Sequence, residues 1–181
     1  MRKNQKGFSL IELLIVVAII LIIAAIAIPN LLRSKMAANE AAAVGAVRTI
    51  VTAQVTYYST YNTGYATTLT ALSGTAGAAA TCAAAQLLDP TFNSAVPAKQ
   101  GYNFYMAAAN PPANVPATAC NGIDDQTFDV TAVPITVGTT GQRSFCDDQS
   151  GAIMYDPTGA LTTTPGGTSC AKDGFTLALG Q

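Results

Sequence analysis

A single carboxylate stands in the otherwise apolar N-terminal part of the chain. Glu12 directly precedes an unbroken apolar run from Leu13 to Pro29. An acidic side chain near the centre of a membrane-spanning helix costs roughly 2.5–3.5 kcal/mol on insertion scales, and less near the interface. A charge in this position therefore predicts a functional role and a partner of opposite charge.

The segment before this acid is basic and indicates a membrane topology. Its cationic residues are Arg2, Lys3 and Lys6. The positive-inside rule places this end in the cytoplasm. Three interpretations are open: a secretory signal peptide cleaved after Ala25-Ile26-Ala27, a plain single-span anchor, or a segment cut after Gly7 that keeps its apolar helix. Glu12 disfavours the first two, because neither benefits from an acid inside the hydrophobic stretch.

The cysteines predict an oxidising environment for the rest of the chain. They all follow the apolar run, as Cys82, Cys120, Cys146 and Cys170. No C-x-x-C spacing occurs and the chain has no histidine, so disulfides are favoured over zinc. Disulfides persist in the periplasm or at the cell surface, which agrees with export of everything after the run. The sequence alone permits three pairings.

Two groups of aspartates have the ligand type that calcium prefers. One comprises Asp124, Asp125 and Asp129, and the other Asp147, Asp148 and Asp156. Neither forms a D-x-[DN]-x-[DN]-G loop, and paired aspartates in turns are usually solvated. We therefore predict no metal site and keep the first group as calcium candidates.

The composition excludes several classes of function. Without histidine, the Ser and Thr hydroxyls lack the usual base that activates a nucleophile. No Gly-rich phosphate loop precedes a helix. We predict no enzymatic activity and no cofactor. Without the basic leader, six basic side chains face ten acidic ones, a net charge of −4 (6 − 10), so no nucleic-acid partner is predicted.

A long helix must position the N-terminal residues. The apolar run is followed by an amphipathic stripe at intervals of three and four: Val44, Val47, Val51, Val55 and Tyr58. The charged residues fall at other positions: Arg33, Lys35, Glu40 and Arg48. Asn62-Thr63-Gly64 is a stop signal, so we expect one helix from about Ser9 to Tyr61, roughly 80 Å long. Pro29 lacks an N–H for the Ala25 carbonyl and predicts either a local opening or a gentle kink with the helix intact.

The remaining sequence predicts a small antiparallel sheet. A connection rich in Ala, Thr and Gly leads to Gln100, with a short helix expected around Ala83–Leu88. The expected strands are Tyr102–Met106, Thr127–Val133, Ser144–Cys146 and Ala152–Tyr155. Asp148-Gln149-Ser150-Gly151 reads as a hairpin turn. The predicted fold class is α+β, with three to four strands covering the Val44–Val55 stripe of the helix.

The N-terminal residues resemble those of a known family. The sequence from Gly7-Phe8-Ser9-Leu10-Ile11-Glu12 to Ile20, after a basic leader, is similar to the class III leader junction of type IV prepilins and type II secretion pseudopilins. The resemblance covers about thirty residues, including Pro29. It implies cleavage after Gly7 by a prepilin peptidase, N-methylation of Phe8 and assembly through N-terminal helix packing. Glu12 would pair with the Phe8 amine of a neighbouring subunit and act as a register device.

The resemblance also implies details of the C-terminal part. Many type IV pilins have a disulfide-bounded C-terminal region, which would pair Cys146 with Cys170 and leave Cys82 for Cys120. It implies the pilin fold, divided as leader 1–7, membrane or filament-core helix 8–32, amphipathic helix 33–61, connection 62–100 and sheet region 101–181.

The function predicted from these residues is that of a structural type IV pilus subunit. The expected partners are further copies of the chain, the prepilin peptidase, the inner-membrane assembly machinery of a pilus or type II secretion system, and lipid before assembly. The subunit would wait in the bacterial inner membrane with a cytoplasmic N-terminus and end in a surface pilus. The alternatives are a type II secretion pseudopilin and a membrane-anchored binding module that does not polymerise.

Overall fold

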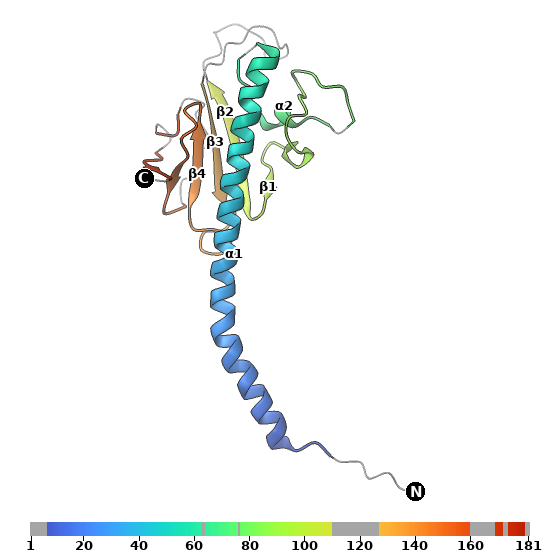
Figure 1. Cartoon of the computed structure of the whole chain (residues 1–181), viewed down its shortest axis with the longest axis vertical. Coiled ribbons are helices and arrows are strands. Elements are labelled where there is room, and N and C mark those ends of the chain that lie inside the picture. The colour runs from blue at the N-terminus through green and yellow to red at the C-terminus, as the bar shows by residue number, and fades with distance from the viewer. Residues whose placement is uncertain are drawn as a thin grey trace. The chain divides into compact units, whose positions relative to one another are not determined.

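The computed structural model describes residues 7–62, 64–75, 77–109, 127–159, 169–171 and 174–179. These residues fall into two compact units, Met1–Lys35 and Met36–Gln181. The long helix α1, Leu10–Tyr61, contributes to both (Figure 1). Its bounds confirm the helix expected from the sequence, with Ser9 just outside the first turn.

In the first unit, α1 carries the apolar run without interruption. It remains helical through Pro29, so of the two outcomes expected for this proline the intact helix is observed. Within the described part of the chain, α1 is long and apolar enough to cross a membrane, judged by length and composition.

The second unit is built on an antiparallel sheet with strand order β1-β2-β3-β4-β5-β6. The strands are β1 Ala98–Lys99, β2 Tyr102–Ala109, β3 Thr127–Pro134, β4 Ser144–Asp148, β5 Met154–Asp156 and β6 Leu177–Ala178. The four strands read from the sequence are β2 to β5. The two edge strands were not expected, because a two-residue strand has no alternation to read. The hairpin turn is confirmed: the Gly151 N–H donates to the Asp148 carbonyl at 2.9 Å, and Gly151 has a φ of 70°.

The part of α1 that belongs to the second unit covers one face of this sheet (Figure 1). The sheet contributes buried aromatic and aliphatic side chains to the core: Tyr102, Phe104, Phe128, Val130, Ala132 and Phe145. The helix contributes Ala43, Val47, Ile50, Ala53 and Tyr57.

The buried stripe of α1 differs from the predicted one by about one residue. Val55 and Tyr58 were expected in the core, but they are 56% and 41% exposed. The buried positions include Gln54, a polar residue that an apolar pattern passes over. Its side-chain nitrogen donates to the Ala66 carbonyl and its oxygen accepts the Ala66 N–H, both at 2.8 Å. These two bonds satisfy the amide, so a polar group can occupy the core-facing position.

Among its described residues, the connection between α1 and the sheet contains the short helix α2 Leu69–Ser73 and the 3-10 turn η1 Pro90–Phe92. The helix expected at Ala83–Leu88 is not formed, and that prediction was wrong. Backbone N–H groups of Ala85 and Leu87 donate instead to carbonyls of α2 at 2.8 Å. Gln86 has a φ of 54°, outside the helical region. Tertiary hydrogen bonds thus outweigh the weak helix propensity of a short Ala-rich segment.

Candidate functional site at the N-terminal helix

The predicted N-terminal site lies at the first turn of α1. Gly7, Phe8 and Ser9 precede the helix and have no regular secondary structure. The Ser9 carbonyl accepts the first helical bond, from the Leu13 N–H at 3.3 Å. The Glu12 carboxylate reaches back and accepts the Ser9 N–H through Oε2 at 3.0 Å. This is the N3 half of a capping box, in which an acid satisfies a backbone donor left unpaired at the helix start.

The cap explains how the acid is held where the helix begins. The N-terminal end of a helix carries partial positive charge, so a carboxylate in the first turn is stabilised there. The second carboxylate oxygen, Oε1, accepts no hydrogen bond from the described residues. One oxygen is therefore committed to the helix cap, and the other can accept a further donor.

The helix that follows this site presents apolar side chains on every side. Phe8 is 75% exposed, and the large aliphatic residues from Leu10 to Leu32 are exposed as well. Exposure of this apolar surface to water is unfavourable, and exposed apolar patches of this extent mark contacts with protein or membrane.

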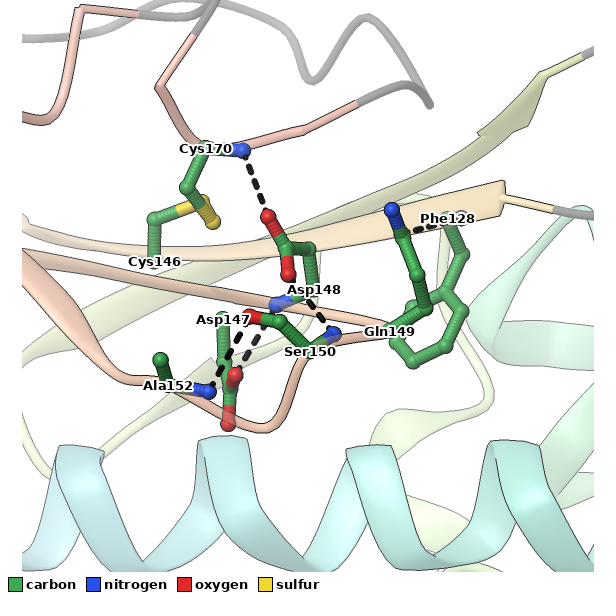
Figure 2. The surroundings of a disulfide bond; sticks show 8 residues. All are labelled: Phe128, Cys146, Asp147, Asp148, Gln149, Ser150, Ala152 and Cys170. Carbon is green, nitrogen blue, oxygen red and sulfur yellow. Dashed lines mark hydrogen bonds between the residues drawn. A yellow bond between two sulfur atoms is a disulfide. The ribbon is translucent and has the colours of Figure 1, made fainter.

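The second predicted site, the disulfide region, lies on the face of the sheet opposite α1. Cys146 in β4 is bonded to Cys170, as the family resemblance implied. The Asp148 carboxylate accepts the N–H of Cys170 at 3.1 Å and that of Ser150 at 2.8 Å (Figure 2). The C-terminal segment is thus fixed to β4 by one covalent bond and one charge-assisted hydrogen bond. Cys82 is also in a disulfide, and its expected partner Cys120 lies outside the described residues.

The side chain of the neighbouring acid, Asp147, points away from the disulfide (Figure 2). Its carboxylate lies on the α1 side of β4 and accepts the Asp148 N–H at 2.9 Å (Figure 2). Burial raises its pKa to about 6, and the charge of Asp148 adds to the rise, while the Asp148 N–H and Arg48 oppose it. Adjacent strand residues face opposite sides of a sheet, so Asp147 and Asp148 do not converge on one site.

The calcium candidates do not form a site among the described residues. Asp129 is buried in β3, opposite Asp148. Asp124 and Asp125 lie outside the described residues. In the part of the chain that the structure describes, no group of three or more Asp, Glu, Cys or His side chains could hold a metal ion.

Sequence reasoning missed an ion pair between the buried Glu40 of α1 and the partly exposed Arg143 in the loop before β4. Glu40 was expected on an outer face of the helix, but it is 8% exposed. Its Oε2 accepts bonds from the Arg143 guanidinium at 2.9 and 2.6 Å. Its Oε1 accepts the backbone N–H groups of Gln142 at 2.8 Å and Arg143 at 3.2 Å. The sequence signal for this pair was the position of Glu40 close to the buried stripe of α1. Its partner Arg143 is 103 positions away, so the pairing could not be read from the local sequence.

The N-terminal segment is similar in sequence to known proteins. Residues 2–28 match the prokaryotic N-terminal methylation motif. The chain is 63% identical over 38 residues to the type IV wide pilus major component of Thermus thermophilus. It is 46% identical over 56 residues to the type IV major pilin protein of Myxococcus xanthus.

In its N-terminal segment, the chain is similar to type IV prepilins.

The likeness to these pilins is local. The matched segments cover 21% and 31% of this chain, and 29% and 26% of the two relatives. No solved structure matches the chain. Gly7, Phe8 and Glu12 lie within the prepilin motif, whereas Pro29 and the whole sheet lie beyond it. A long N-terminal helix packed on an antiparallel sheet is consistent with the pilin fold.

Proposed function

We propose that the chain is the structural subunit of a type IV pilus. The observation that carries this proposal is the coincidence of the methylation motif at residues 2–28 with a helix whose apolar side chains are exposed on all sides. Such a helix needs lipid around it in a single subunit and other helices around it in an assembly. A filament core of packed copies supplies the second environment.

The proposal includes processing between Gly7 and Phe8, with N-methylation of the new terminus. The conformation of this junction supports it. Gly7 to Ser9 lie outside the helix, and a Cβ atom added at Gly7 would meet no other atom within 4 Å. A peptidase can reach a scissile bond in such a segment more easily than one inside a hydrogen-bonded turn. The chain is then a substrate of the prepilin peptidase, not an enzyme itself.

Glu12 is the proposed register device between subunits. Cleavage creates a cationic amine on Phe8, and the free Oε1 of Glu12 in a neighbouring copy can accept it while Oε2 keeps the helix cap. Buried ion pairs contribute little net stability, but a mismatched one leaves an uncompensated charge. The pair would therefore select one register among many similar apolar packings.

The cellular setting follows from the same features. The subunit would be stored in the inner membrane with its basic leader in the cytoplasm, then extracted by the pilus machinery and displayed on the surface. A type II secretion pseudopilin would share the same N-terminal chemistry. Both relatives described above are named as type IV pilus components, which favours the pilus.

Two substitutions at one position separate the charge of Glu12 from its capping role. Glu12→Ala removes both, whereas Glu12→Gln keeps an acceptor for the Ser9 N–H and removes the charge. Leu13→Ala, a change in the adjacent apolar residue, is the matched control. Each variant replaces the wild-type chain in cells, and sheared surface filaments are quantified by electron microscopy.

If Glu12 acts by charge pairing, both Glu12 variants lose filaments by roughly tenfold or more, and the control does not. The subunit should remain inserted in the membrane and cleaved after Gly7. Normal filaments in Glu12→Gln would show that the cap alone matters and would refute the pairing. Absence of filaments in the wild type would favour the non-polymerising membrane anchor instead.

A further inference from the structure

The uncharged part of α1 has the length of a membrane's hydrocarbon core. Glu12 and Arg33 bound a stretch, 13–32, that contains no charged residue. At about 1.5 Å per residue this stretch rises about 30 Å, close to the ~30 Å of hydrocarbon in a bilayer. Arg33 and Lys35 therefore come directly after the point where a spanning helix would leave the hydrocarbon.

These two cations are arranged around the helix and not along one side. Positions two apart in an α-helix are separated by about 200°. Both side chains are exposed, and neither makes a salt bridge to another described residue. One protein partner on a single face of α1 could not engage both cations. Lipid headgroups surround a spanning helix and can contact both.

The position of the cations also runs against the usual charge bias. In the orientation set by the basic leader, Arg33 and Lys35 lie on the exported side, where the positive-inside rule disfavours them. The cost of placing them there suggests that they contribute to membrane attachment at that side.

We propose that Arg33 and Lys35 form a cationic collar that binds the phosphates of anionic phospholipid headgroups and sets the depth of the stored subunit in the membrane. This inference rests on the proposed membrane-stored form of the pilin. Each cation near an anionic surface is expected to enrich anionic lipid by roughly fivefold at most, and less at high ionic strength.

The chain contains no tryptophan, so a single reporter can be placed beside the collar. Leu32→Trp lies at the predicted hydrocarbon edge, where tryptophan is well tolerated. The full-length variant is reconstituted into phosphatidylcholine vesicles containing a minor fraction of phosphatidylglycerol. Either lipid carries brominated acyl chains, and fluorescence quenching reports which lipid lies next to the helix.

The collar predicts stronger quenching by brominated phosphatidylglycerol than by an equal fraction of brominated phosphatidylcholine. The preference should disappear in R33Q/K35Q and weaken as salt rises from 0.1 M to 1 M, where the Debye length falls from about 10 to 3 Å. It should persist in Arg48→Gln, a control on the same helix in the second unit.

Three results would overturn the inference. Equal quenching by the two lipids, or a preference that survives R33Q/K35Q, would refute the collar while leaving membrane insertion intact. Absence of quenching by both lipids would refute insertion itself, and with it both the collar and the membrane-stored form.

Discussion

Arg143 and Glu40, 103 positions apart in the sequence, are joined by two guanidinium–carboxylate hydrogen bonds of 2.9 and 2.6 Å. The same carboxylate accepts two backbone N–H groups of the loop before β4, so it ties that loop to α1. Arg143 also lies 5.6 Å from the Phe145 ring centre and 5.5 Å from that of Tyr155. The Tyr102 hydroxyl donates to the Arg143 carbonyl at 2.9 Å and adds a further link to this loop.

We expect the two halves of this pair to be unequal on substitution. Glu40→Ala leaves two backbone donors and a guanidinium without their acceptor, and should cost about 2–3 kcal/mol of unfolding free energy. Arg143→Ala should cost about 1 kcal/mol, because the arginine is partly exposed and Glu40 keeps its backbone partners. Chemical denaturation of the detergent-solubilised chain measures both. Equal losses would contradict the role assigned to the backbone bonds.

The observed helix stripe predicts which aliphatic positions matter for the core. Ile50→Ala removes a fully buried side chain and should cost about 2–5 kcal/mol. Val55→Ala, on the same helix but 56% exposed, should change stability by less than about 0.5 kcal/mol. The same denaturation measurement compares them. A larger loss at Val55 would restore the stripe predicted from the sequence.

Asp147 predicts a pH dependence of stability. Its pKa rises from the ordinary 3.8 to about 6 in the folded chain, mainly through burial. The folded state therefore binds the proton more tightly, and this contribution to stability is full below about pH 4 and is lost as pH rises through 6. Asp147→Asn should raise the free energy of unfolding at pH 7 by about 1–2 kcal/mol, after allowance for solvent screening. It should also reduce the change of unfolding free energy with pH between pH 4 and 6. Denaturation curves at several pH values decide; an unchanged slope in the variant would exclude Asp147 as the titrating group.

The Cys146–Cys170 bond should stabilise the C-terminal part of the sheet. It joins residues 24 positions apart in the sequence, and removing such a bond typically costs about 2–4 kcal/mol. Replacing both cysteines with serine should lower the melting temperature measured by circular dichroism. Asp148→Asn, which keeps the disulfide but weakens the bond to the Cys170 N–H, should cause a smaller loss. A melting temperature unaffected by the double replacement would mean that β6 and Phe175 hold the segment alone.

The sequence was most informative where structure is local. The helix bounds at Leu10 and Tyr61, the hairpin at Gly151 and strands β2 to β5 all follow from short-range pattern. The candidate site stays a prediction, and it rests on local sequence too, because Gly7, Phe8 and Glu12 lie within one short motif.

The sequence was least informative where a residue depends on a distant partner. Glu40 and Gln54 look like surface positions until the β3–β4 loop and Ala66 supply their hydrogen bonds. Likewise, the segment around Gln86 takes its shape from backbone bonds to α2, so its alanines predicted a helix that does not form.

The central claim is that this chain is cut after Gly7 and assembled through the new terminus. Mass spectrometry of the N-terminal peptide from sheared surface filaments tests it most directly. The account predicts a peptide that begins at N-methylated Phe8 and still contains Glu12. A mature terminus at Ile28 would contradict it, because the chain would then have been processed as a secretory protein and would have lost the helix proposed to form the filament core.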